Sequence, residues 1–266
     1  MKLVVLGSGT SVPHPERSSS AFWLETKAGS VLLDVGASAV HRIAQEGLGW
    51  VELDAIWISH FHLDHVGGLA PFLFGTKYAP QTQARRKPLT IFGPRGTNKL
   101  LRAFDSAGTY ELLEHPFPLE VREIAPRAEF EMLPGLRART LSTPHTRESV
   151  ALRLTDEHDG TSLVYTSDTG YTEALASFAR DVDLLMIECS FWRTSPVKTH
   201  LVLEEAMNLA KQSGTRRALL THLYPEWDGV DVAAEAKKLW DGETIEARDG
   251  VRLEINKATN GRQDSS

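Results

Sequence analysis

The stretch Ser59-His60-Phe61-His62-Leu63-Asp64-His65 holds three imidazoles and one carboxylate within six residues. Its first residue, Ser59, ends the apolar run Ala55–Ser59, which predicts a buried β-strand, and the histidines follow that run. Because alternate side chains of an extended backbone share a face, we expect His60 and His62 to point the same way. The aspartate and the last histidine then fall where the chain turns into a helix. The segment therefore predicts two adjacent sets of metal ligands.

Imidazole nitrogens and carboxylate oxygens at this density suit divalent cations, zinc first, with manganese or iron as alternatives. A purely structural explanation is weak, because neighbouring imidazoles add little to packing and cost free energy when buried without hydrogen-bond partners. Two cations need more ligands than this segment holds, so others are expected at the ends of other strands. The candidates, each following an apolar run, are His145, Asp168 and His222.

Each of these candidates also has an ordinary interpretation. A single histidine at a strand end is most often a satisfied surface or core residue, and Asp168 before Gly170 suits a simple turn. The cluster at residues 60–65 is what makes them ligand candidates. A carboxylate placed like Asp168 would supply the bridge that a two-metal site otherwise lacks.

The composition of the chain is that of an ordinary globular protein. Of its 266 residues 41% are hydrophobic and 24% charged, and the net charge of −6 argues against a nucleic-acid binder that relies on overall basicity. Cys189 is the only cysteine, which excludes an internal disulfide and a cysteine-rich zinc site. Because neither a signal peptide nor a membrane span is evident, we expect a cytoplasmic protein.

Short apolar runs separated by Gly, Pro, Ser or Asp dominate the chain. They predict strands over Leu3–Leu6, Ala21–Glu25, Val31–Val35, Ala55–Ser59, Pro88–Phe92, Leu119–Ile124, Glu129–Met132, Leu136–Leu141, Ser149–Leu154, Ser162–Thr166, Asp183–Ile187 and Arg217–Thr221. A closing hairpin is expected from Thr244–Ala247 and Val251–Ile255. Helical spacing predicts helices over Ser38–Glu46, Gly67–Leu73, Gly96–Ala107, Glu173–Phe178, His200–Ser213 and Val232–Trp240.

Blocks of strands with helices between them and no internal linker indicate two sheets packed face to face with helices outside. We expect a single domain over residues 1–257 and a polar tail over 258–266. A duplication in which each half supplies one sheet is compatible with this pattern, but residue identities do not reveal it.

Basic residues gather at two places despite the acidic total. Gln81–Lys87 is polar and basic and is predicted to be a mobile surface loop. Its Arg85, Arg86 and Lys87 form either a rim that steers a phosphate or an ordinary solvated turn. A second pair, Arg193 and Lys198, lies close before His200.

The motif His-x-His-x-Asp-His at residues 60–65 resembles that of the metallo-β-lactamase-fold superfamily, and the chain is most similar to its ribonuclease Z-like branch. The supporting segments are Leu6-Gly7-Ser8-Gly9-Thr10 with Pro13 and Arg17, Leu32-Leu33-Asp34-Val35-Gly36, Leu89-Thr90-Ile91-Phe92-Gly93-Pro94 and Asp183-Leu184-Leu185-Met186-Ile187-Glu188. The resemblance runs over nearly the whole chain. It implies an α/β (α+β) fold, a four-layer αββα sandwich of two mixed sheets.

The resemblance also implies a role for each matching residue. One cation would be held by His60, His62 and His145, the other by Asp64, His65 and His222, with Asp168 bridging both. A histidine placed like His200 would face the scissile phosphate and pair with Glu188, although His200 also suits the start of a surface helix. Asp34 would orient a ligand loop or serve as a plain turn residue.

The expected reaction is hydrolysis by a hydroxide held between the two cations, with Asp64, His200 and Glu188 as catalytic residues. No Gly-x-Ser-x-Gly nucleophile motif is present, which favours direct attack by water. We expect a phosphodiesterase acting on nucleic-acid ends, nucleotides or small phosphodiesters. A β-lactamase is least favoured, because no secretion signal is evident.

Two other functions stay open at this point. The same pair of cations serves hydrolysis of a lactone or thioester, and a non-catalytic metal-dependent sensor or binding protein is the third class. The chain also departs from ribonuclease Z proper, since it has neither a Gly/Pro-rich insertion for gripping transfer RNA nor a Pro-x-Lys-x-Arg substrate loop. A homodimer is expected from the resemblance alone.

Overall fold

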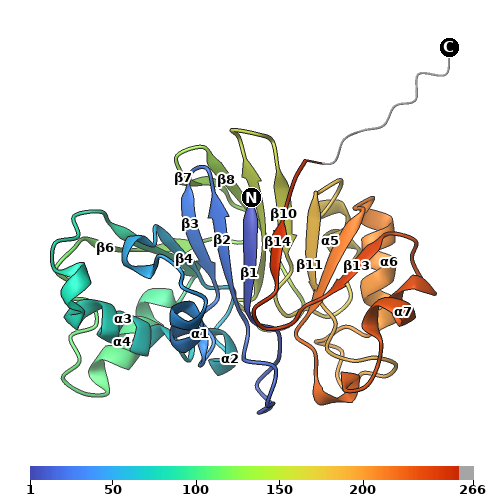
Figure 1. Ribbon diagram of the computed structural model, residues 1–266, viewed down its shortest axis with the longest axis horizontal. Helices are drawn as coiled ribbons and strands as arrows, with labels where there is room; N and C mark the ends of the chain where they lie inside the picture. The colour runs from blue at the N-terminus through green and yellow to red at the C-terminus, as the bar shows by residue number, and fades with distance from the viewer. Residues whose placement is uncertain (258–266) are drawn as a thin grey trace.

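Two seven-stranded mixed β-sheets form the centre of the protein, as a computed structural model that describes residues 1–257 shows (Figure 1). The first sheet has the order β14-β1-β2-β3-β4-β5-β6. Its strands are β1 Lys2–Gly7, β2 Ala21–Thr26, β3 Gly29–Leu33, β4 Ala55–Trp57, β5 Leu89–Pro94, β6 Leu119–Ile124 and β14 Arg252–Glu254. The second sheet has the order β13-β12-β11-β10-β9-β8-β7. Its strands are β7 Glu129–Leu133, β8 Leu136–Ser142, β9 Val150–Asp156, β10 Ser162–Tyr165, β11 Leu184–Glu188, β12 Arg217–Thr221 and β13 Glu243–Glu246.

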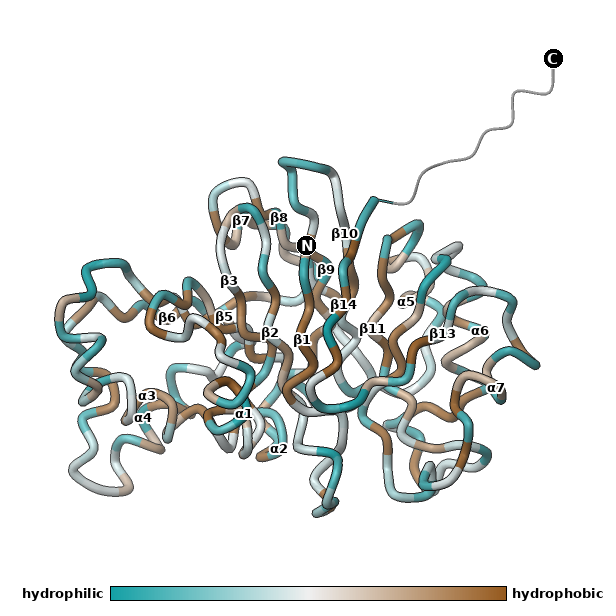
Figure 2. The backbone as a smooth tube through the Cα atoms, viewed as in Figure 1, coloured by the Kyte–Doolittle hydropathy of each residue, from teal (hydrophilic) through white to brown (hydrophobic). Residues whose placement is uncertain are grey.

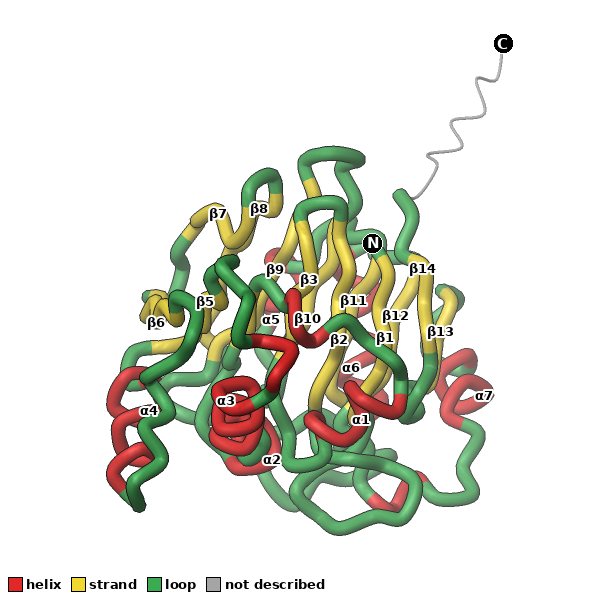
Figure 3. The backbone as a smooth tube through the Cα atoms, turned by 60° about the vertical axis from the view of Figure 1, so that its left-hand side comes forward, coloured by secondary structure: helices red, strands yellow, loops and turns green. Residues whose placement is uncertain are grey.

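Helices cover the outer faces of both sheets, so the expected four-layer sandwich is confirmed (Figures 1 and 3). The helices are α1 Ala39–Gln45, α2 Leu63–Val66, α3 Leu69–Tyr78, α4 Thr97–Ser106, α5 Glu173–Phe178, α6 Leu203–Ser213 and α7 Val232–Lys237. Three short 3₁₀ turns, η1 Trp50–Glu52, η2 Pro80–Thr82 and η3 Pro225–Trp227, complete the elements. Among residues 1–257, no helix has the length and apolar character needed to cross a bilayer.

The apolar side chains form three layers, one between the sheets and one beneath each set of helices. Strand β1 shows how the sequence produces this: Leu3 and Val5 join the layer between the sheets, while Val4 and Leu6 face the helices. Because both faces of the strand are buried, it appears in the sequence as a continuous apolar run rather than an alternating one. Figure 2 shows the hydrophobic residues concentrated along the central strands.

The two sheets repeat one pairing pattern. From β1 to β6 the successive pairs are antiparallel, antiparallel, parallel, parallel and parallel. The same order runs from β8 to β13. Each half of the chain therefore supplies most of one sheet, a relation that residue identities did not reveal.

The predicted closing hairpin is wrong. Strand β13 pairs with β12 in parallel, whereas β14 pairs with β1 in the other sheet. The segment between them crosses from sheet to sheet: the N–H of Ala247 donates to Leu220 and that of Gly250 donates to Val5. Gly250 has a φ of 88°, which a residue with a side chain rarely adopts. Two short strands separated by a turn suggested a hairpin, but long-range pairing decided otherwise.

Two helix starts also differ from the sequence expectation. Helix α2 begins at Leu63, so Asp64 and His65 lie within it rather than before it. Helix α6 begins at Leu203 and leaves His200 outside, because the Glu205 carboxylate accepts a hydrogen bond from the Val202 N–H at 3.1 Å. A side chain that caps the backbone in this way fixes where a helix begins.

The segment predicted as a mobile basic loop is instead anchored. Arg85 is only 5% exposed, and its guanidinium donates to the carbonyls of Val51, Leu53, Lys87 and Pro88. The Lys87 ammonium pairs with Asp54 at 2.6 Å. These contacts hold the segment against the N-terminal end of β4, whereas the histidine cluster follows the C-terminal end. Of the two interpretations of this segment, these contacts favour a structural role over a rim that steers a phosphate.

Candidate metal centre

All seven predicted ligands meet at one edge of the sandwich. Three groups of side chains have ligand atoms that lie within 4.8 Å of one another, and two of these groups consist of the predicted ligands. The first set is His60, His62, His145 and Asp168, and the second is Asp64, His65, Asp168 and His222. Asp168 belongs to both. Five of the seven follow strands β4, β8, β10 and β12, and the other two lie in α2.

The spacing within these sets matches that of ligands around a small cation. Asp168 Oδ2 lies 3.3 Å from His222 Nε2, 3.5 Å from His145 Nε2 and 3.7 Å from His60 Nε2. Its Oδ1 lies 3.2 Å from His65 Nε2. Two ligands bound at about 2.1 Å to a tetrahedral zinc are roughly 3.4 Å apart. The donor atoms are therefore already at the separation that such an ion requires.

Unpartnered polar atoms also face this centre. Within residues 1–257, His60 Nε2, His65 Nε2 and Asp168 Oδ1 are buried and lack a hydrogen bond of good geometry, although the last two lie 3.2 Å apart. Burying such atoms without a partner costs free energy, and a bound ion is one way in which proteins satisfy them. Since all three are good ligands for a divalent cation, the residues present fit a metal ion at this place.

The opposite ring nitrogens are held by the protein. His65 Nδ1 lies 2.7 Å from Asp34 Oδ2, and His145 Nδ1 lies 3.0 Å from the carbonyl of Thr199. His222 Nδ1 lies 3.0 Å from Ser190 Oγ. Because these contacts occupy Nδ1, each imidazole presents Nε2 to the centre.

The charges at the centre follow from its geometry. Burial alone would raise the pKa of Asp168, but the imidazoles of His222, His65 and His60 hold the pKa of this carboxyl well below its usual value. Burial disfavours the charged form of His65, yet Asp168 and Asp34 raise its pKa well above the ordinary one. Burial and the neighbouring His65 lower the pKa of His60. An ionised carboxylate thus lies among imidazoles and attracts positive charge: a proton on His65, or a divalent cation that takes the place of that proton.

Glu188 and His200 lie next to the ligand cluster. Glu188 is 1% exposed, and its Oε1 lies 2.8 Å from His200 Nδ1. The His200 ring stacks on that of His222, with centroids 5.3 Å apart and planes inclined by 11°. Burial opposes protonation of His200, but the hydrogen bond and charge of Glu188 raise its pKa above the ordinary value. The expected pairing of these two residues is present in the structure.

Several residues of the site were not singled out from the sequence. Ser190 Oγ donates to Glu188 at 2.7 Å, and Ser59 Oγ donates to Asp34 at 2.7 Å. Tyr165 reaches Asp34 from the other sheet, with its hydroxyl 2.7 Å from Oδ2. In the sequence, a serine beside a histidine cluster is only weak evidence for a place in the site. An aromatic residue in a buried strand gives no such evidence. Only the three-dimensional arrangement identifies them.

Comparison with known proteins agrees with this geometry. A family model described as Anti-Pycsar protein Apyc1 matches residues 1–241. The uncharacterised protein ML1173 of Mycobacterium leprae is 32% identical over 267 residues, covering 96% of this chain and 89% of that protein. Ribonuclease Z of Methanosarcina acetivorans is 26% identical over 310 residues, covering 96% of this chain and 98% of that protein.

A third relative links sequence and fold. The probable metallo-hydrolase YhfI of Bacillus subtilis is 27% identical over 257 residues, covering 94% of this chain and 98% of that protein. Its crystal structure, described as a metallo-β-lactamase fold protein, superposes with a TM-score of 0.80 at 24% identity, over 95% of this chain and 98% of that one. The chain therefore belongs to the Anti-Pycsar protein Apyc1 family and is a metal-dependent hydrolase of the ribonuclease Z-like branch of the metallo-β-lactamase fold.

Proposed function

We propose that this hydrolase is a phosphodiesterase that works with two divalent cations, zinc in the first place. The observation that carries the proposal is the Glu188–His200 pair beside the ligand cluster. A protonatable imidazole held by a buried carboxylate is what cleavage of a phosphodiester with a poor leaving group needs. Hydrolysis of an ester or lactone with a good leaving group has less use for it.

The proposed ligand sets follow the two groups of side chains. One cation is assigned to His60, His62 and His145, the other to Asp64, His65 and His222, and Asp168 to both. The ligand spacing and the unpartnered buried nitrogens support this assignment. When bound, the cations would supply an acidified water molecule and a Lewis acid for a phosphoryl oxygen.

The remaining chemistry belongs to side chains of the protein. Asp64 is 8% exposed and belongs to the second ligand set, where its carboxylate can accept a hydrogen bond from the attacking water and orient it. His200 donates from Nδ1 to Glu188, so its Nε2–H is left to protonate the departing oxygen. Glu188 can hold this ring in place because its own carboxylate is fixed by three hydrogen bonds. The donors are the backbone N–H groups of Thr169, Ser190 and Leu201.

The proposed substrates are nucleic-acid ends, nucleotides or small phosphodiesters. The ribonuclease Z relative supports a nucleic-acid or nucleotide substrate. The net charge of −6 and the missing transfer-RNA-gripping insertion favour a small substrate over a long duplex.

An activity panel on the metal-loaded protein tests this function. The substrates are bis-p-nitrophenyl phosphate, a cyclic nucleotide, a transfer-RNA precursor and a lactone. We expect turnover of the model diester and of at least one natural phosphodiester. Turnover of the lactone alone would replace the proposal by ester chemistry, and metal binding without turnover of any substrate would indicate a sensor.

Substitution of His200 by Ala separates its proposed role from simple structural support. p-Nitrophenolate leaves without protonation, whereas the alkoxide of a nucleotide does not. We therefore expect kcat on the nucleotide substrate to fall on the order of 10²–10⁴-fold, and kcat on bis-p-nitrophenyl phosphate to fall far less.

The matched control for this experiment is His41→Ala, which removes an exposed imidazole on α1. It should leave both rates unchanged. An equal loss on the two substrates in His200→Ala would contradict a role in leaving-group protonation.

A further inference from the structure

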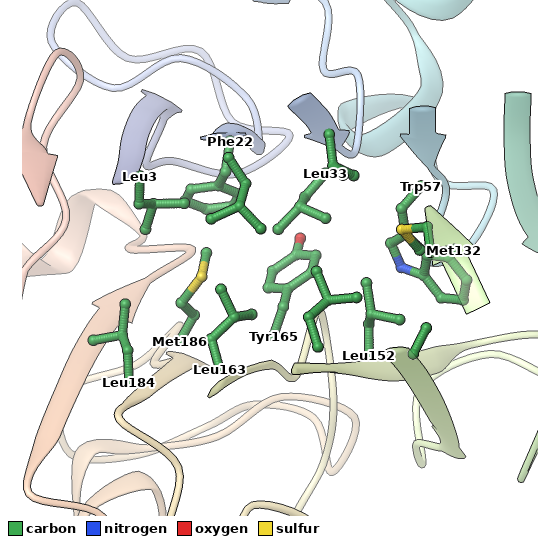
Figure 4. Close-up of a cluster of buried hydrophobic side chains, with 14 of the residues drawn as sticks. Leu3, Phe22, Leu33, Trp57, Met132, Leu152, Leu163, Tyr165, Leu184 and Met186 are labelled. Atoms are coloured by element: carbon green, nitrogen blue, oxygen red, sulfur yellow. The ribbon is translucent and has the colours of Figure 1, made fainter. Parts of the chain in front are cut away.

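Tyr165 places a polar group in the apolar layer between the two sheets. Its side chain is 1% exposed and belongs to the inter-sheet layer, and its ring meets that of Phe22 edge to face with centroids 5.3 Å apart. Figure 4 shows the hydroxyl pointing across the core, away from its own strand β10 and toward the strand that carries Leu33. A buried phenol needs a hydrogen-bond partner, and here the partner lies in the opposite sheet.

That partner is Asp34, a fully buried carboxylate directly after β3. Its Oδ2 lies 2.7 Å from each of three donors: Tyr165 Oη, Ser59 Oγ and His65 Nδ1. Its Oδ1 accepts from the Ser59 N–H at 2.8 Å. Two of the three side chains come from the first half of the chain, while Tyr165 comes from the second.

The metal centre is likewise assembled from residues of both halves of the chain. His60, His62, Asp64 and His65 belong to the first half, and His145, Asp168 and His222 to the second. Asp34 determines which nitrogen of His65 faces Asp168, at 3.2 Å. A hydrogen bond from the second sheet to Asp34 therefore connects the orientation of His65 to the position of the sheet that carries His145, Asp168 and His222.

We infer that Tyr165 is a positioning residue for the metal centre: its hydroxyl holds the Asp34 carboxylate, and through it the His65 ring, in register with the ligands of the second sheet. The inference rests on the metal centre of the proposed function but not on its substrate. Loss of a group that hydrogen-bonds a metal ligand directly lowers metal affinity by roughly 10–100-fold. Tyr165 acts one bond further out, through Asp34, so its loss should cost less.

Tyr165→Phe tests the inference, because it removes the hydroxyl and keeps the ring. Affinity for Zn²⁺ would be measured by competition with a chelator, together with the d–d spectrum of the Co²⁺-loaded protein. We expect a loss of affinity of up to about 10-fold, the lower end of the range for a direct partner of a ligand, and an altered spectrum. The control Tyr171→Phe removes a surface hydroxyl that accepts from Asn208 at 3.0 Å, and should change neither.

A double variant shows whether the effect passes through Asp34. If it does, Tyr165→Phe should lower metal affinity no further in an Asp34→Asn background. Wild-type affinity and spectrum in Tyr165→Phe, even with a lower melting temperature, would overturn the inference and leave a purely structural role. Additive losses in the double variant would also overturn it.

The two proposals fail in different ways. If the wild-type protein binds zinc tightly but cleaves no phosphodiester, the proposed function falls, and the affinity measurements still decide the role of Tyr165. If the diester is cleaved but Tyr165→Phe binds metal normally, only the inference falls. A wild-type protein that binds no divalent cation would overturn both.

Discussion

Asp168 and Asp64 are both buried carboxylates of the centre, yet their surroundings differ. Asp168 lies within 3.7 Å of nitrogen atoms from four imidazoles, two of them in each candidate set. Asp64 Oδ2 lies 3.4 Å from His222 Nε2 and 3.8 Å from His65 Nε2, and both imidazoles belong to one candidate set. In the sequence, each is an aspartate within five residues of a histidine or a glycine. Only their contacts in the structure distinguish their roles.

This difference predicts the metal content of two variants. Asp168→Asn weakens both sets, so we expect it to retain less than one cation per chain. Asp64→Asn affects one set, so we expect one retained cation and loss of most turnover. Elemental analysis after gel filtration measures the content, and circular dichroism checks the fold. Two cations in Asp168→Asn would contradict the bridging assignment.

Turns after corresponding strands carry the polar groups that support the centre. The Asp34 N–H donates to the carbonyl of Trp57, and its carboxylate accepts from the Ser59 N–H. At the matching place in the second sheet the Thr166 N–H donates to Met186, and its hydroxyl accepts from the Glu188 N–H. Ser59 and Glu188 therefore occupy equivalent positions, and each contacts a histidine of the site.

The other end of β4 is held by Arg85, which yields a prediction about stability. Arg85→Ala leaves the buried Leu53 carbonyl without this donor, at about 1–3 kcal/mol, while the three part-buried carbonyls become accessible to water at a smaller cost. We therefore expect the free energy of unfolding to fall by about 2–4 kcal/mol. Because these contacts lie at the end of β4 away from the histidines, kcat and KM should stay near wild type.

The neighbouring Arg86 is exposed and serves as the control. Arg86→Ala should change the unfolding free energy, measured in urea, by less than about 0.5 kcal/mol. A KM for phosphodiesters that rises several-fold in either variant would instead restore the role of this segment as a phosphate rim.

Over the whole molecule, the two ends of the described chain meet in one sheet. Strand β14 pairs with β1, and the N–H of Ile255 donates to the carbonyl of Met1. Ile255 is fully buried between the sheets, and Leu253 packs against the same layer. The first sheet is therefore completed only by the last strand, although the repeat divides most of the chain into two halves.

Two truncations test this closure and the proposal that residues 1–257 form the single domain. Removal of residues 251–266 deletes β14 and three apolar side chains, Val251, Leu253 and Ile255. Full burial of one such side chain is worth about 1.5–3 kcal/mol and partial burial less, so we expect the unfolding free energy to fall by about 3–6 kcal/mol. Removal of residues 258–266 alone should leave the melting temperature unchanged. A marked loss in the shorter truncation would extend the domain beyond residue 257.

Residue types and their spacing were enough to predict the local features: the histidine cluster, the apolar runs that form strands, and the ligand candidates at strand ends. These depend on residue type and short-range periodicity, which one chain displays directly. The polar tail over 258–266 lies outside the described residues, and the homodimer and the cytoplasmic location stay predictions.

The tertiary structure alone decided which distant segments meet. It separated β13 from β14, buried Arg85 against β4, and brought Tyr165 to Asp34. Such contacts depend on how the two sheets pack. The sequence of a strand that is apolar on both faces does not indicate which strand it will pair with or pack against. For the same reason His145, Asp168 and His222 were candidates in the sequence and became a cluster only when the two halves closed on each other.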